Sequence, residues 1–165
     1  DAEMALRESN LLDNRNSEVW AYQALLCLQV GVRRSEEADA ALFQTLRLGL
    51  SAPSVLRELA TAFMASDKLQ IAEDLIRRAL ASESGKGSFT TRKLLGDVLA
   101  GQNLAAKAVD EYKAVLEATE FDGDVDYPRT QLAAAERCVT LLQSLGRAEE
   151  AKSAAAIATK LRSTL

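Results

Sequence analysis

The sequence contains no histidine among its 165 residues. Histidine is the commonest general base near neutral pH and the commonest metal ligand in proteins. Its absence excludes Ser–His and Cys–His nucleophile pairs. Carboxylate, lysine or tyrosine chemistry stays open in principle, but the sequence offers no motif for it. We therefore expect a protein that is not an enzyme and that holds no cofactor and no metal.

Proline is scarce as well, with only Pro53 and Pro128 in the chain, and runs of β-branched residues are few. Alanine and leucine dominate a sequence that is 48% hydrophobic. This composition favours helix over sheet throughout. We expect an all-α fold, and a single domain is the default for a chain of this length.

An excess of basic residues, a long apolar run and a cysteine framework are also missing. The net charge of −4 argues against nucleic acid as a partner. The chain has no stretch of about 18 consecutive apolar residues, so no membrane span is predicted. Its first residues do not resemble a signal peptide. Cys27 and Cys138 lie in apolar helical patterns, which predicts buried free thiols and a reducing, cytoplasmic compartment.

A pattern of small and apolar residues recurs along the chain. Each copy has an alanine, a residue four positions later that is apolar or small, and a third residue three positions further on. The copies begin at Ala2, Ala38, Ala72, Ala108 and Ala151, at intervals of 36, 34, 36 and 43 residues. The three positions fall on one face of a helix, and the intervals leave room for two short helices per unit.

A second pattern precedes the last four copies and marks the first helix of each hairpin. It reads Trp20–Gln23–Ala24–Cys27, Leu56–Leu59–Ala60–Phe63, Arg92–Leu95–Gly96–Leu99 and Ala135–Cys138–Val139–Leu142. In three hairpins a small residue of the first helix faces the alanine that opens the second helix, which predicts close helix packing. These pairs are Ala24/Ala38, Ala60/Ala72 and Gly96/Ala108. Val139 faces Ala151 in the last hairpin, which we expect to be more open.

These patterns resemble the tetratricopeptide repeat family, whose 34-residue unit carries W-x2-L-G-x2-Y in its first helix and A-x3-F-x2-A in its second. The best matches are Trp20 with Tyr22, Leu95-Gly96, Ala72 with Ile76 and Ala79, and residues 145–151. The chain lacks the terminal proline of the family repeat and has Arg92 and Ala135 at the position of the first aromatic. The resemblance implies a right-handed solenoid of stacked antiparallel hairpins. Helical-repeat families with looser periods are the alternative.

The repeat register divides the chain, taken as a single solenoid over residues 1–165, into repeats at approximately 1–14, 17–50, 53–86, 89–120 and 128–165. About nine helices follow, at 2–13, 17–30, 35–49, 53–66, 69–82, 89–101, 104–119, 128–145 and 148–162. Serines at 17, 51 and 88 stand where helix N-caps are expected, and glycines at 31, 101 and 146 stand in the predicted turns. The structural positions of the repeats are Trp20, Ala24, Ala38, Ala60, Ala72, Gly96, Ala108 and Ala151.

The two ends of the predicted solenoid are expected to contact other protein surfaces. The first repeat is represented by its second helix alone, and the last residues form no evident polar cap. Because solenoids need solvated terminal repeats, we expect partly apolar end faces. The chain would then self-associate through them or pack against the remainder of a longer parent chain.

Two loops bear a superficial likeness to ligand-binding motifs. The Gly-Lys-Gly run at residues 85–87 lacks the G-x4-G-K-[ST] spacing and the preceding strand of a phosphate-binding loop. Aspartates alternate over residues 122–126 as in a calcium loop, but Tyr127 replaces the glycine at loop position six and Ala133 the glutamate at position twelve. We expect a linker and a solvated acidic insertion, without nucleotide or calcium.

First helices line the groove of tetratricopeptide proteins, so the resemblance implies a candidate partner-binding groove here. Its residues are Tyr22, Arg57, Thr61, Met64, Lys93, Asp97 and Arg137. We expect the three basic side chains to recognise acidic side chains of a partner segment, with Tyr22 and Met64 supplying apolar contact. The alternative is that Glu58, Asp97 and Glu136 neutralise these bases within the stack.

The repeats exhaust the chain, which predicts a protein–protein interaction scaffold. A passive structural spacer that packs laterally is the alternative, and an apolar convex face would favour it. The stretches Asn16–Leu28 and Phe43–Leu50 look like the C-terminal repeat region of cilia- and flagella-associated tetratricopeptide proteins of the axoneme. That resemblance implies an axonemal complex as partner, and an adaptor in another cytoplasmic machine is the second possibility.

Overall fold

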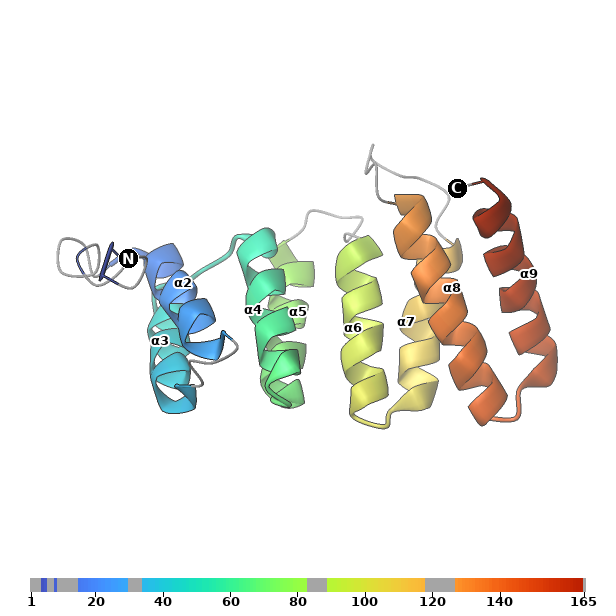
Figure 1. Ribbon diagram of the computed structural model, residues 1–165, viewed down its shortest axis with the longest axis horizontal. Coiled ribbons are helices and arrows are strands. Elements are labelled where there is room, and N and C mark those ends of the chain that lie inside the picture. The colour runs from blue at the N-terminus through green and yellow to red at the C-terminus, as the bar shows by residue number, and fades with distance from the viewer. Residues whose placement is uncertain are drawn as a thin grey trace. The chain divides into compact units, whose positions relative to one another are not determined.

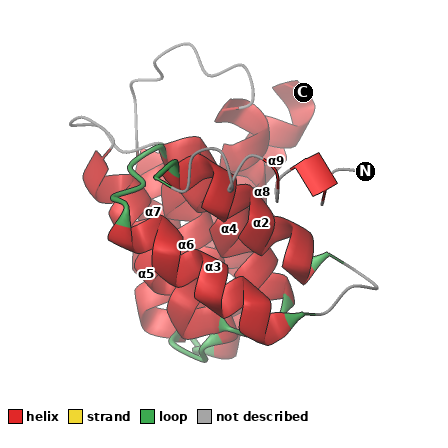
Figure 2. Cartoon of the chain, turned by 90° about the vertical axis from the view of Figure 1, so that its left-hand side faces the viewer, coloured by secondary structure: helices red, strands yellow, loops and turns green. Residues whose placement is uncertain are grey.

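The computed structural model describes residues 4–5, 8, 15–29, 34–82, 89–117 and 127–164. Over these ranges the chain forms eight long helices and no strand (Figures 1 and 2). The all-α prediction is confirmed. The helices are α2 (Ser17–Leu28), α3 (Ser35–Arg47), α4 (Pro53–Ala65), α5 (Leu69–Ser82), α6 (Phe89–Gly101), α7 (Ala105–Glu117), α8 (Tyr127–Ser144) and α9 (Ala148–Thr164).

Three predictions fall on parts of the chain that the structure does not describe. They concern most of the helix expected at residues 2–13, the Gly-Lys-Gly run at 85–87 and the alternating aspartates at 122–126. The glycine turn at residue 31 and the serine cap at residue 88 also lie outside the described residues. These remain sequence-based predictions.

The helices fall into two compact units, Asp1–Ser82 and Glu83–Leu165. The first unit contains the hairpins α2–α3 and α4–α5, and α4 also packs against α2. The second contains the hairpins α6–α7 and α8–α9, and α8 packs against both α6 and α7. Each unit is therefore a pair of stacked hairpins, in the register that the repeat predicts.

Three hairpins reverse direction through the same turn. Asp67, Asn103 and Gly146 have positive φ values of 60°, 62° and 71°. The next residue in each turn donates its backbone N–H to a buried residue five positions back, namely Phe63, Leu99 or Leu142, at 2.9 Å in every case. These three acceptors occupy the same position of the sequence pattern, so the three turns are equivalent.

Some local signals were placed wrongly by a residue or two. Gly101 is the last residue of α6, and Asn103 adopts the left-handed conformation, which asparagine tolerates through local hydrogen bonding. Asn16, and not Ser17, caps α2, since its Oδ1 accepts from the backbone N–H of Glu18 at 2.9 Å. Before α4 the cap position is Ala52 and not Ser51, with Pro53 in the first turn.

The small residues expected between paired helices are buried. Ala24, Ala38, Ala60, Ala72 and Ala108 are all 0% exposed, and Ala151 is 4% exposed. Trp20 is only partly buried. Gly96 is the tightest position, because a Cβ there would lie 2.6 Å from Cε1 of the buried Tyr112. The α6 backbone thus lies directly on the tyrosine ring of α7.

Candidate functional site

In the first unit, the predicted groove residues lie on the neighbouring helices α2 and α4. Arg57, Thr61 and Met64 follow at intervals of four and three, which places them on one face of α4. Thr61 is exposed, while Arg57 and Met64 are partly buried. Tyr22 on α2 is 44% exposed. All four side chains therefore reach the surface, and they mix one charge, one hydroxyl and two largely apolar groups.

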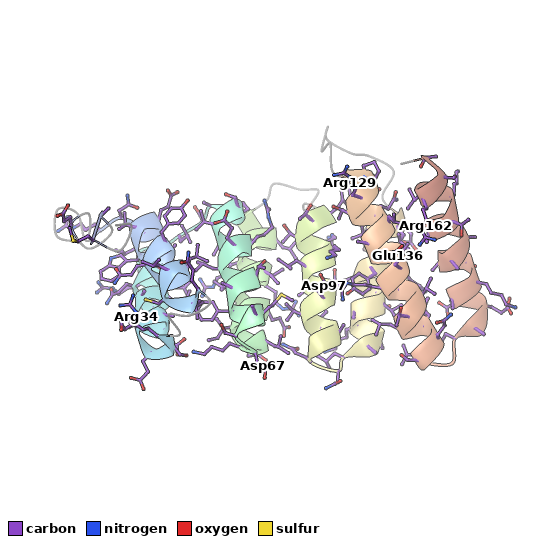
Figure 3. All side chains as sticks on the ribbon, viewed as in Figure 1. Arg34, Asp67, Asp97, Arg129, Glu136 and Arg162 are labelled. Atoms are coloured by element: carbon purple, nitrogen blue, oxygen red, sulfur yellow. The ribbon has the colours of Figure 1, made fainter. Side chains whose placement is uncertain are left out.

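In the second unit, Asp97 of α6 is the centre of a network that joins three helices. Its Oδ2 lies 2.7 Å from Nζ of Lys93, one turn earlier on α6. Its Oδ1 lies 3.1 Å from Nε of Arg137 on α8 and accepts the Tyr112 hydroxyl of α7 at 2.7 Å. The Asp97 side chain is only 8% exposed. Figure 3 labels Asp97 on the middle of α6.

The structure brings together the three groove residues that the sequence predicts in this unit. Lys93 and Arg137 share one carboxylate, so the group carries a net charge of about +1 at neutral pH. Lys93 is largely covered, with a side-chain exposure of 23%, whereas 58% of the Arg137 side chain is exposed. Arg137 is therefore the basic group that a partner can reach.

The neutralisation that we considered as an alternative is present for Asp97, which pairs with both bases. Glu136 behaves differently, because its Oε1 pairs with Arg162 of α9 at 2.5 Å and with neither groove base (Figure 3). The Glu136–Arg162 pair links α8 to α9. Of the three acidic residues in that alternative, Glu58, Asp97 and Glu136, only Asp97 pairs with Arg137.

Tyr112 is a structural member of the network. Burial, followed by its hydrogen bond to Asp97, raises the pKa of the phenol well above its ordinary value of 10. The hydroxyl therefore keeps its proton and donates a hydrogen bond to Asp97. A permanent donor on the buried side holds the carboxylate in place while Lys93 and Arg137 approach it from other directions.

Sequence reasoning missed this link between the groove and the core. One signal was available, because a glycine in the first helix opposite a tyrosine in the second leaves room for a ring, and Asp97 directly follows that glycine. The described residues contain no group of His, Cys, Asp or Glu side chains that could hold a metal ion. The arrangement is suited to recognising charged and apolar side chains.

Helix α9 exposes mainly polar side chains, among them Lys152, Ser153, Thr159, Lys160, Ser163 and Thr164. Ile157 is the large apolar exception, at 38% exposure. Self-association through the end faces stays a prediction.

Known proteins resemble this chain in sequence and in fold. Residues 1–132 match the family described as "Cilia and flagella-associated protein 70 C-terminal domain". Cilia- and flagella-associated protein 70 of Homo sapiens and that of Macaca fascicularis are each 48% identical to this chain over 61 residues. That stretch is 37% of this chain but only 5% and 6% of the two relatives, so the chain corresponds to a small part of their length.

Two solved structures share the fold. A crystal structure of MamA has a TM-score of 0.75 at 17% identity and covers 98% of this chain and 86% of its own. A second MamA structure has a TM-score of 0.74 at 18% identity, with coverages of 97% and 80%. At such low identity the likeness shows the fold alone. Within the described ranges, none of the helices has the length and apolar character needed to cross a membrane.

Proposed function

We propose that this chain, which belongs to the family of the cilia and flagella-associated protein 70 C-terminal domain, is a non-enzymatic protein-interaction scaffold in a ciliary or flagellar complex. The observation that carries the proposal is the Asp97 network, which presents a basic side chain on the face of α6 and α8. Hairpins account for all the described helices.

The partner that suits this face is a segment with acidic side chains. Arg137 approaches Asp97 through Nε and is 58% exposed, so its guanidinium is fixed by one carboxylate and accessible to another. Guanidinium groups bind carboxylates with two parallel hydrogen bonds, which favours acidic partners over neutral ones. In the first unit, Arg57 with Tyr22 and Met64 supplies a similar mixture of charge and apolar surface.

The test begins with affinity capture by the full-length parent protein from ciliated cells, followed by binding measurements with the captured partner. Arg137→Glu should weaken binding by more than tenfold, equivalent to about 1.4 kcal/mol. Lys152→Glu on α9 is the matched control, because Lys152 is 74% exposed and lies outside this face. Equal binding by wild type and Arg137→Glu, with circular dichroism showing both folded, would refute the role of the α6–α8 face.

A laterally packed structural spacer is the second candidate. It is favoured by large apolar side chains that are exposed on second helices, namely Phe43 of α3 at 65% and Ile157 of α9 at 38%. If Phe43→Ser removed the chain from its complex while Arg137→Glu did not, the spacer function would be preferred.

A further inference from the structure

A slot opens between α7 and α9, on the side of α8 that carries Cys138 and Leu142. Both helices pack on α8, whereas the backbones of α7 and α9 are not in direct contact and the Lys113–Glu150 ion pair links them. The resulting pocket has a volume of about 200 Å³. Cys138 and Leu142 form its floor, and Leu116, Ala154 and Ile157 form its walls. We refer to this pocket as the α7–α9 slot.

The size of the slot indicates what it holds. A cavity of about 150 Å³ in another protein is large enough for benzene, whereas pockets for small ligands and cofactors usually exceed about 300 Å³. One aromatic or branched aliphatic side chain therefore fits. The floor is apolar and uncharged, since burial raises the pKa of the Cys138 thiol.

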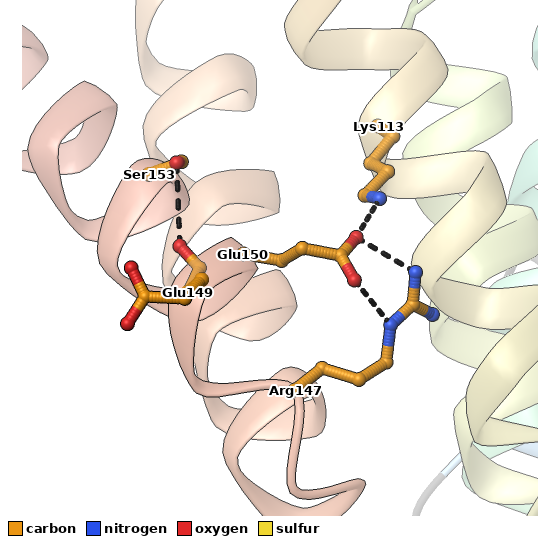
Figure 4. A network of polar contacts seen from close by, with 5 residues as sticks. All are labelled: Lys113, Arg147, Glu149, Glu150 and Ser153. Atoms are coloured by element: carbon orange, nitrogen blue, oxygen red, sulfur yellow. Dashed lines mark hydrogen bonds and ion pairs between the residues drawn. The ribbon is translucent and has the colours of Figure 1, made fainter.

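One end of the slot is positively charged. Glu150 of α9 accepts hydrogen bonds from Nε and Nη2 of Arg147, at 2.6 and 2.7 Å, and also pairs with Lys113 of α7 (Figure 4). One carboxylate between two cations leaves a net charge of about +1 on these three groups, of which Lys113 and Glu150 line the slot, while Asp110 of α7 also attracts Arg147. Lys113 and Arg147 have side-chain exposures of 33% and 38%, so an incoming carboxylate can reach them.

The other end is negatively charged. Glu117 lies one turn beyond Lys113 on α7, is exposed and lines the slot. It forms no ion pair with any residue in the described ranges. The slot thus has an apolar centre with a positive end and a negative end, separated by about one helical turn, roughly 6 Å along α7.

We propose that the α7–α9 slot docks an amphipathic helix of a partner protein, which inserts one large apolar side chain and places an acidic residue at Lys113 and Arg147 and a basic residue at Glu117. Helix-in-groove recognition uses anchors of this kind. The charged ends of the site lie on the second helices of the unit and are distinct from the α6–α8 face, so the site does not depend on the function proposed for Arg137.

The probes are three alanine-based helical peptides, each with a central phenylalanine. The mixed peptide has glutamate three residues before the anchor and lysine one residue after it, so that the two charges lie four residues, or about 6 Å, apart along the helix. The acidic peptide has glutamate at both positions, and a third peptide is the mixed one with alanine for phenylalanine. Binding is measured by titration into the isotopically labelled 165-residue chain, with the Ile157 signals as the local NMR readout.

We expect the mixed peptide to bind the wild-type chain about three- to tenfold more tightly than the acidic one, because exposed ion pairs contribute modestly. Glu117→Lys makes both ends positive and should reverse this order. Glu149→Lys, the same charge change at a residue outside the slot that is 85% exposed, should leave the order unchanged. Arg137→Glu should also leave it unchanged.

The proposal is overturned by any of three results. The first is that no peptide shifts the Ile157 signals at millimolar concentration, as would occur if the chain itself covered the slot. The second is that the peptide without phenylalanine binds as tightly as the mixed one. The third is that Glu117→Lys and Glu149→Lys show the same preference between the mixed and acidic peptides.

Discussion

Replacing Gly96 by alanine measures how tightly α6 packs on α7. The added Cβ would lie 2.6 Å from Cε1 of Tyr112 and 2.9 Å from Cδ1 and Cζ. Carbon atoms in ordinary contact are about 3.5–4.0 Å apart, so these distances are strongly repulsive. The ring is fully buried, and its hydroxyl is bonded to Asp97, so it cannot move aside without breaking that hydrogen bond.

Two opposing effects set the magnitude. Overpacking of a filled core typically costs about 1–3 kcal/mol. Alanine in place of glycine inside a helix gains about 0.5–1 kcal/mol through helix propensity. Because three atoms of a ring that cannot move are approached at once, we expect the steric cost to dominate. Gly96→Ala should lower the free energy of unfolding by about 1–2 kcal/mol.

The assay is urea denaturation followed by far-UV circular dichroism, applied to a double-mutant cycle of Gly96→Ala and Tyr112→Leu. Leucine lacks the ring atoms that the new Cβ would meet. In that background Gly96→Ala should be neutral or stabilising by up to about 1 kcal/mol, which gives a clear coupling energy. If Gly96→Ala is harmless in the wild type, or equally harmful in both backgrounds, the packing argument is refuted.

Two further predictions concern other hairpins. Ala72→Leu should destabilise the α4–α5 hairpin by about 1–3 kcal/mol, because Ala72 is 0% exposed against α4, and an unchanged urea midpoint would contradict this. Hydrogen bonds from Arg147, and then Lys113, lower the pKa of Glu150 to about 2, below the usual value of about 4.3. Because the pKa is depressed in the folded state, this stabilisation is complete above about pH 5 and is lost as the pH falls towards 2. The stability difference between wild type and Glu150→Gln should therefore shrink on acidification from pH 5 to 2, and a constant difference would show that Glu150 is not stabilised in the fold.

The helices could be predicted because their signals are local and repeated. Alanines such as Ala38, Ala72 and Ala108 recur at nearly constant intervals and are buried, so the register of the hairpins follows from the sequence. The ends of helices were less certain. Gly101 was expected in the turn between α6 and α7, but Asn103 takes its left-handed position, since both residue types tolerate that conformation and the sequence does not decide between them.

The candidate site could be predicted only in part. Lys93, Asp97 and Arg137 were identified as residues of the first helices, and they do meet. The hydrogen bond from Tyr112 depends on how α7 is rotated against α6, which local periodicity does not specify. The α7–α9 slot was missed for a similar reason, because it arises between two helices whose backbones are not in direct contact.

The turns at Asp67, Asn103 and Gly146 have a consequence for how this chain tolerates change. All three form the same 2.9 Å backbone hydrogen bond although they carry different side chains, so the junction within a hairpin is specified by the main chain. Turns of one geometry make the segments between them interchangeable, each segment being a second helix and the first helix that follows it. Duplication, deletion or exchange of such a segment at these turns would preserve the path of the backbone within each hairpin, while the residues displayed on either helix vary independently.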